Sequence, residues 1–232
     1  MTSAQAETVS AFPDFQMDDA PEFEADGIPR FDPDEMDVGR IEAELAELPH
    51  LTGDRSYQEP LTIERIYRSE GARNAIESLS EIPNPTTAIH TIISGRFALW
   101  DYVPAVIQLG GTIESLYLAT LGFSRKNMAE LSAMLDAGQI GSVSLICSHY
   151  FKGTSNGIYE FAAEQLSARG QRFLSIRTHA KIVLIKLADG RTITLESSAN
   201  LRSCKNIEQV FIAGLPDLHR FHSTWMDELF RA

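Results

Sequence analysis

Two short apolar runs joined by an Asp-Gly turn constrain the fold of this 232-residue chain more than any other feature. Residues 181–187 and 191–195 are rich in β-branched side chains, and Ala188-Asp189-Gly190 connects them. Such residues favour strands, and an Asp-Gly pair supplies the backbone conformation that a tight hairpin turn needs. The sequence therefore predicts an antiparallel hairpin, whose two open ends meet at one edge of a sheet.

Strands and helices alternate through the rest of the chain from residue 61 onward. Alternation of this kind, with helices of about 12 residues, is typical of an α/β fold with a mixed β-sheet flanked by helices. Further strands are predicted at residues 88–94, 115–121, 143–147, 172–177 and 208–213, and helices at 63–79, 97–109, 125–137, 156–168 and 218–230.

The acidic residues are concentrated in the first quarter of the chain. Residues 1–60 hold 16 of the 32 Asp and Glu but only 3 of the 20 Lys and Arg, a net charge of −13, whereas residues 61–232 carry a net charge of +1. Four prolines interrupt residues 13–33, and the phenylalanines there are isolated. Such a segment cannot bury enough apolar surface to offset the entropy of ordering. We therefore predict a mostly disordered acidic tail at 1–60 before one α/β domain at 61–232.

The role of this tail stays open at the level of sequence. It can be a solubilising linker, a docking segment for a protein partner, or an acidic mimic of a phosphate backbone that covers the domain's own site. Residues 38–48 include Ile41, Leu45 and Leu48 at helical spacing, which predicts a short helix within the tail.

Several protein classes are disfavoured. The longest apolar runs are too short to span a bilayer, and residues 1–10 show no secretory signal. Cys147 and Cys204 make no disulfide framework, so we expect reduced thiols and a cytoplasmic location. Those cysteines with His149 and His179 match no zinc-ligand spacing, so neither a metal nor a cofactor is predicted.

Polar residues flank the predicted hairpin on both sides. His179-Ala180-Lys181 precedes it, and Ser197-Ser198-Ala199-Asn200 follows it, so the hairpin brings both groups to one end of the sheet. Lysine neutralises phosphoryl oxygens, Ser and Asn donate hydrogen bonds to them, and His can attack phosphorus or carry a proton. This set of side chains indicates a phosphoryl site.

The same residues resemble the HKD motif of the phospholipase D superfamily, H-x-K-x4-D-x6-G-[ST]-x-N. Glu208, at the start of the next strand, also fits, because in the family's small nuclease branch a Glu there orients the histidine. Lys186 stands where the motif has Asp, and Ser197 where it has Gly. The resemblance implies one phospholipase D-like lobe with His179, Lys181, Ser198, Asn200 and Glu208 as catalytic residues.

A single motif copy has a mechanistic consequence within that resemblance. The family's reaction uses two histidines, so the resemblance implies a homodimer whose two motifs meet at a two-fold axis. One His179 forms a phosphohistidine and the other acts as general acid, without a metal. The implied activity is a phosphodiesterase, in the first place a nuclease acting on DNA or RNA.

Five further residues are candidates for substrate binding. Ser197, Arg202 and Lys205 lie beside the motif, and His149 and Lys152 follow a predicted strand at a place where α/β sheets collect ligand-binding loops. Two other functions remain open: a catalytically weak or inactive phosphate- or nucleic-acid-binding module regulated by the acidic tail, and a phospholipid hydrolase.

Overall fold

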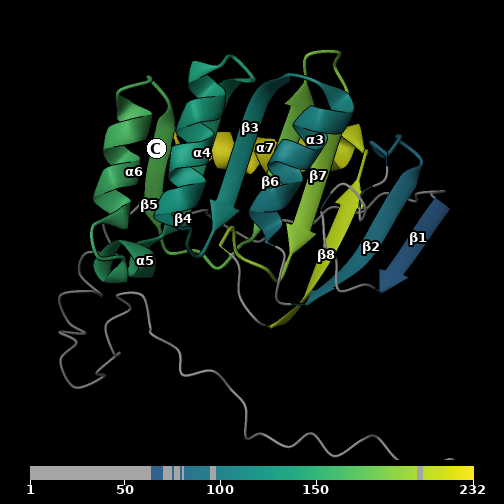
Figure 1. The fold of residues 1–232 in the computed structure, drawn as a ribbon, viewed down its shortest axis with the longest axis horizontal. Coiled ribbons are helices and arrows are strands. Elements are labelled where there is room, and N and C mark those ends of the chain that lie inside the picture. The colour runs from purple at the N-terminus through teal and green to yellow at the C-terminus, as the bar shows by residue number, and fades with distance from the viewer. Residues whose placement is uncertain (1–63, 70–74, 76–78, 80, 95–97, 203–205) are drawn as a thin grey trace, which may run out of the picture.

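The computed structural model describes residues 64–69, 75, 79, 81–94, 98–202 and 206–232. Its centre is one mixed sheet in the order β1-β2-β8-β7-β6-β3-β4-β5 (Figure 1). The strands are β1 (Glu64–Ser69), β2 (Thr87–Ser94), β3 (Ile113–Thr120), β4 (Ile140–Ser148), β5 (Arg172–Ile176), β6 (Ile182–Leu187), β7 (Thr192–Ser197) and β8 (Ile207–Ala213).

Strand direction decides which connections gather at each edge of this sheet. β3, β4 and β5 pair in parallel, β6 pairs antiparallel with β3, and β7 pairs antiparallel with β6. Consequently β3, β4, β5 and β7 all end at the same edge, where β6 and β8 begin. We call this the carboxyl edge, and the opposite one, which holds the β6–β7 turn, the turn edge.

Helices cover the sheet on both faces. Helices α3, α4 and α6 lie on one face, α7 lies on the other, and α5 is at the carboxyl edge below β4 and β5 (Figure 1). Their bounds are α3 (Tyr102–Gly110), preceded by a 3-10 turn at Leu99–Asp101, α4 (Arg125–Asp136), α5 (His149–Thr154), α6 (Ile158–Ser167) and α7 (Pro216–Leu229). The predicted mixed sheet flanked by helices is therefore confirmed.

Alternation along the strands divides the apolar side chains between two layers. Val183, Ile185 and Leu195 belong to the larger core, on the side of α3, α4 and α6. Ile182 and Leu184 face the other way and pack with Trp225, Met226 and Leu229 of α7. Because both faces are buried, β6 is apolar at nearly every position, as expected for an inner strand.

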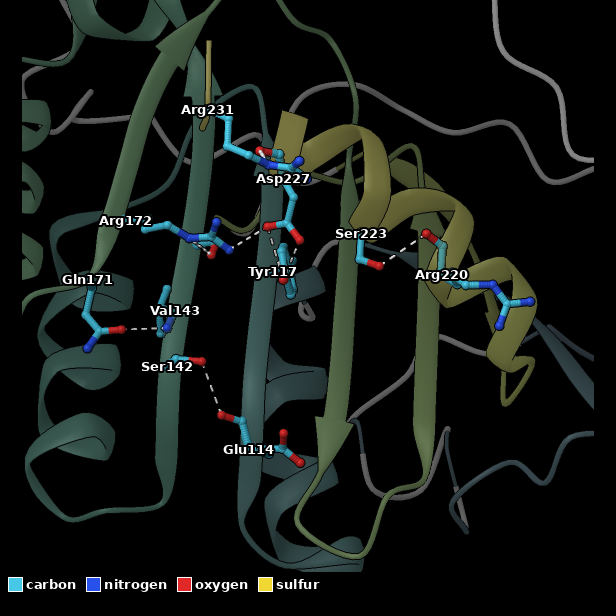
Figure 2. A network of polar contacts seen from close by, with 11 residues as sticks. Glu114, Tyr117, Ser142, Val143, Gln171, Arg172, Arg220, Ser223, Asp227 and Arg231 are labelled. Atoms are coloured by element: carbon cyan, nitrogen blue, oxygen red, sulfur yellow. Dashed lines mark hydrogen bonds and ion pairs between the residues drawn. The ribbon is translucent and has the colours of Figure 1, made fainter. Parts of the chain in front are cut away.

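Helix α7 is also held to the sheet by polar contacts. Asp227 accepts hydrogen bonds from the Tyr117 hydroxyl of β3 at 3.3 Å and pairs with Arg172 of β5 at 2.7 Å, as Figure 2 shows. Further along, His222 lies 2.6 Å from Glu196 of β7 and accepts a hydrogen bond from Trp225. These contacts fix the helix across β5, β3 and β7.

The predicted helix at residues 63–79 is partly wrong. Glu64–Ser69 forms strand β1, which pairs in parallel with β2 through Glu64 opposite Thr87 to Ser69 opposite Ile92. The free edge of β2 offers backbone partners that local helical periodicity does not reveal, and strand propensity depends strongly on such context. Ala75 and Leu79 are helical, as predicted, and both are buried.

A second correction concerns residues 149–168. The prediction of one helix from residue 156 missed α5 and started α6 too early. Asn156 and Gly157 have φ values of +47° and +77°, which interrupt the helical backbone, so α6 begins at Ile158. The predicted N-cap at Ser124 is confirmed, since its hydroxyl accepts from the amide of Asn127.

Residues 1–60, including the predicted acidic tail and its short helix at 38–48, lie outside the described residues. The boundary at residues 60 and 61 therefore stays a prediction. Of the two cysteines, Cys147 is a buried free thiol, and burial raises its pKa to about 12, while Cys204 lies outside the described part of the chain.

Gly214, directly after β8, has no room for a side chain. A Cβ there would meet the carbonyl oxygens of Pro83 and Asn84, the latter at 2.6 Å. Gly214→Ala is therefore expected to destabilise the fold by about 1–3 kcal/mol, the usual cost of overpacking. Gly153→Ala is the matched control, since a Cβ there meets no atom within 4 Å. Urea unfolding measures both, and equal stability of the two variants would contradict the packing described.

Acid is expected to weaken the fold through His219 of α7. Burial, helped by the charges of His222 and Lys186, lowers the pKa of His219 from 6.5 to about 4. As the pH falls from 6.5, the unfolded chain therefore binds the proton first, and stability is lost between pH 6.5 and about 4. His219→Phe should remove roughly 2–3 kcal/mol of that loss. An undiminished loss in urea titrations at pH 7 and 4.5 would refute this assignment.

Candidate active site

The two polar groups that flank the hairpin come together at the carboxyl edge. The amide of Ser197, at the end of β7, donates to the carbonyl of Lys181, just before β6, at 3.0 Å. The amide of Ser198 donates to the carbonyl of Gln209 in β8 at 3.1 Å. The predicted hairpin and the meeting of its two ends are thus confirmed, although the roles of the side chains are a separate question.

His179 and Lys181 are in direct contact. The Lys181 Nζ lies 2.9 Å from His179 Nδ1 and donates to the His179 carbonyl, also at 2.9 Å. The His179 side chain is exposed, whereas Lys181 is only 8% exposed. An ammonium can only donate, so a neutral His179 in this arrangement accepts at Nδ1 and carries its proton on Nε2.

The buried position of Lys181 affects its charge. Burial lowers the pKa of Lys181, and the negative charge of Glu208 partly opposes that effect. Glu208 and Lys181 share the sheet face of the larger core, because Val210 and Val183, two residues further along each strand, both lie in that core. A desolvated ammonium beside an exposed imidazole forms a strong local site for an anion.

Glu208 holds the serine that precedes Asn200. The Ser198 hydroxyl donates to the Glu208 carboxylate and accepts from the amide of Gln209 at 3.0 Å. The sequence resemblance implied that Glu208 orients His179. The structure shows Glu208 in a hydrogen bond with Ser198, the residue that follows β7, and the role of Glu208 toward His179 stays a prediction.

Asn200 is held by a strand that sequence reasoning did not connect with the site. Its Oδ1 accepts from the amide of Leu121 at 3.2 Å and lies 3.5 Å from the Thr120 hydroxyl at the end of β3. Thr120 also receives the amide of Leu201 at 3.4 Å. Because its oxygen is used in this way, the Asn200 carboxamide has its N–H donors for an anion. The only sequence signal for this role of Thr120 was its position near the end of a predicted strand.

The five predicted substrate-binding residues have different surroundings. The Ser197 hydroxyl donates to the Gln209 carbonyl and accepts from the amide of Ala199, so it fixes the turn after β7. His149 is buried, with Nδ1 3.5 Å from the Ser175 hydroxyl. Lys152 and Arg202 are exposed at the carboxyl edge, and Lys205 lies outside the described residues.

Lys186, which stands where the resembled motif has an Asp, belongs to the other end of β6. It pairs with Glu114 at 2.7 Å near the turn edge. Its charge is therefore matched locally, and it lies five residues along an extended strand from Lys181. The presence of Lys186 in place of the motif's Asp therefore alters the turn edge and does not alter the set of side chains at the carboxyl edge.

The side chains gathered here suit phosphoryl chemistry. An exposed imidazole can attack phosphorus or carry a proton, a buried ammonium can stabilise charge on phosphoryl oxygens, and the carboxamide and hydroxyl can donate hydrogen bonds. No group of three His, Cys, Asp or Glu side chains that could hold a metal occurs among the residues that the structure describes.

Comparison with known proteins gives structural likeness only. No protein-family model matches the sequence, and no curated protein matches it. Similar solved structures include polyphosphate kinase from Porphyromonas gingivalis (15% identity, TM-score 0.42, 59% of this chain and 25% of that one) and NucT from Helicobacter pylori (13% identity, TM-score 0.41, 62% of this chain and 96% of that one). Phosphatidylserine synthase from Haemophilus influenzae shares 14% identity, with a TM-score of 0.39 over 62% of this chain and 38% of that one.

The match spans only a quarter of the polyphosphate kinase chain. At such low TM-scores and identities the likeness carries no conclusion about activity. In the described part of the chain, no helix has the length and apolar character needed to cross a membrane.

The charge of Lys181 gives a testable pH dependence. Glu208→Gln removes the negative charge that raises the pKa of Lys181, so Lys181 should lose its proton at a lower pH than in the unmodified protein. Binding of inorganic phosphate, followed by calorimetry from pH 8 to 10.5, should then decline with a midpoint at lower pH. Glu114→Gln, which affects only the partner of Lys186, should leave the midpoint in place. An unchanged or raised midpoint in Glu208→Gln would count against the assignment.

Proposed function

We propose that this protein is a metal-independent phosphodiesterase that forms a phosphohistidine on His179. The observation that supports this proposal is the pairing of an exposed imidazole with a buried ammonium, with Asn200 fixed at the adjoining strand end. The Lys181 Nζ has three N–H donors, of which two are directed at His179 Nδ1 and the His179 carbonyl. The third can bind a phosphodiester oxygen beside the imidazole that attacks phosphorus.

The proposed reaction has two displacement steps. In the first, a ring nitrogen of His179 forms a bond to phosphorus while the bond from phosphorus to the leaving oxygen breaks, and a general acid gives that oxygen a proton. In the second step, water attacks phosphorus and the phosphorus–nitrogen bond breaks. The group that acted as general acid in the first step now acts as general base and takes the proton from the water. Lys181 and Asn200 donate to the non-bridging oxygens in both steps.

A homodimer would supply the general acid. One chain offers one His179, and a two-fold axis at the carboxyl edge would bring the partner subunit's His179 to the opposite side of the phosphorus.

We include in the proposal that DNA or RNA is the substrate, that the location is cytoplasmic, and that residues 1–60 are a docking segment for a protein partner. Arg202, Lys205, Lys152, His149 and Ser197 are proposed as the substrate-binding residues.

His179→Ala should abolish cleavage of plasmid and oligonucleotide substrates measured in EDTA, because the nucleophile is lost. The expected drop is at least 10²–10⁴-fold, the usual contribution of one catalytic proton-transfer group. Arg191→Gln, at the turn edge, is the matched control and should cleave as the unmodified protein does.

Five results would count against this proposal. Cleavage that needs a divalent cation, or that persists in His179→Ala, would exclude the histidine mechanism. Binding of nucleic acid without cleavage would favour the binding module, and headgroup release from phospholipid vesicles would favour the lipid hydrolase. A monomer by size-exclusion chromatography with light scattering would remove the shared site.

A further inference from the structure

Four of the connections at the carboxyl edge, those that adjoin strands β3 to β8, contain basic residues and no acidic ones. Residues 121–126, 149–157, 177–181 and 198–206 contain seven Lys and Arg and no Asp or Glu. Apart from Lys126, which lies 3.7 Å from Glu130, none of these cations within the described residues has a carboxylate partner. The domain is nearly neutral as a whole, but its charge is distributed asymmetrically, with cations gathered at the carboxyl edge.

Five cations elsewhere in the described part of the chain pair with carboxylates. At the turn edge Arg169 pairs with Asp136, Lys186 with Glu114 and Arg191 with Asp189, each at 2.7 Å. On the α7 face Arg172 pairs with Asp227, as Figure 2 shows, and Arg220 with Asp217. Among the described residues, cations without a carboxylate at ion-pair distance therefore gather at the carboxyl edge, which holds His179 and where Glu208 acts on Lys181 at longer range.

These cations are spaced along the edge, one to a strand. In the sheet order β7-β6-β3-β4-β5, they are Arg202 after β7, Lys181 before β6, Arg125 after β3, Lys152 after β4 and Arg177 after β5. Adjacent strands lie ~4.8 Å apart, so the row extends over roughly 19 Å. A single phosphodiester occupies one position of such a row, whereas a chain of phosphates can occupy several.

An exposed aromatic ring lies in the same row. Tyr150, the second residue of α5, is 51% exposed. Its neighbour Lys152 stands 5.5 Å from the Tyr159 ring, and Arg125 stands 4.3 Å from the Phe161 ring. Those two cations are held against α6, while the Tyr150 ring stays open to a partner. Bases stack on exposed rings only when they are unpaired, so a ring among cations is the pattern of single-strand binding.

We propose that the carboxyl edge binds single-stranded nucleic acid along the row from Arg177 to Arg202, with a base stacked on Tyr150 and one phosphate delivered to His179 and Lys181. This deepens the proposed function, on which it rests for the role of His179. The row selects a polymeric phosphodiester over a lipid headgroup or a mononucleotide, because it offers several cations for several phosphates.

The test measures binding separately from cleavage. In full-length protein carrying His179→Asn, fluorescence anisotropy in EDTA follows labelled single strands of 4 and 20 nucleotides, DNA and RNA, and a 20-base-pair duplex. The 20-mer single strands should bind more tightly than the duplex and the 4-mers. Tyr150→Ala should weaken 20-mer binding by about 5- to 150-fold, the range for loss of one stacked base, and Tyr150→Phe should retain it.

Edge cations should show a salt signature. Arg177→Gln and Arg202→Gln should each weaken the 20-mer and lower the slope of log affinity against log salt by about 0.7, one phosphate contact each. Arg191→Gln, whose charge is already matched by Asp189, is the control and should change neither quantity. Circular dichroism confirms that each variant is folded.

The outcomes separate this inference from the proposed function. Suppose that the unmodified protein hydrolyses bis(p-nitrophenyl) phosphate in EDTA but that the Tyr150 and edge-cation variants bind the 20-mer with unchanged affinity. The inference is then overturned, while the phosphodiesterase proposal stands. If that small diester is not hydrolysed but the edge variants weaken the 20-mer, the inference stands and the catalytic proposal fails. Equal or tighter binding of duplex also overturns the inference.

Discussion

The antiparallel pairing of β6 with β7 is the constraint on which the site depends. It places the amide of Ser197 on the carbonyl of Lys181, so two segments that are 16 residues apart in sequence end side by side. Ser198 is then tied to β8 through Gln209 and Glu208. The site is consequently built on a hydrogen-bonded sheet, which holds side chains more firmly than a free loop does.

The burial of Lys181 makes this part of the sheet a site for anions. Lys181 lies among apolar strands with its ammonium against His179, and a cation in that position gains from any anion that approaches. Asn200 reaches the same edge from β7 but takes its orientation from the end of β3. The polar side chains thus come from separate strands, and their arrangement is a property of sheet order rather than of sequence distance.

Much of this was predictable from the sequence because the signals are local. The Asp-Gly turn fixed the hairpin, and the Ser124 cap fixed the start of α4, where its hydroxyl accepts the Asn127 amide. Non-local pairings were not predictable in the same way. Glu64–Ser69 is a strand because β2 offers it a free edge, and Thr120 supports Asn200 only because β3 lies beside β6.

The charge pattern shows the same division between local and spatial information. The excess of acid in residues 1–60 is visible in the sequence, and it conceals a nearly neutral domain. The gathering of cations at one edge emerges only when strand directions are known, because Arg125, Lys152, Arg177 and Arg202 are scattered along the chain. The order and direction of the strands therefore place these scattered cations at one edge of the sheet, where they form a basic surface.

Trapping the covalent intermediate tests the central claim most directly. The unmodified protein is mixed with an end-labelled oligonucleotide in EDTA, quenched at alkaline pH within the first turnover, digested and analysed by mass spectrometry. The account predicts a phosphoryl adduct on the peptide that contains His179, stable to alkali and labile to acid, and absent from His179→Asn. Cleavage of the oligonucleotide with no adduct at His179 would contradict it.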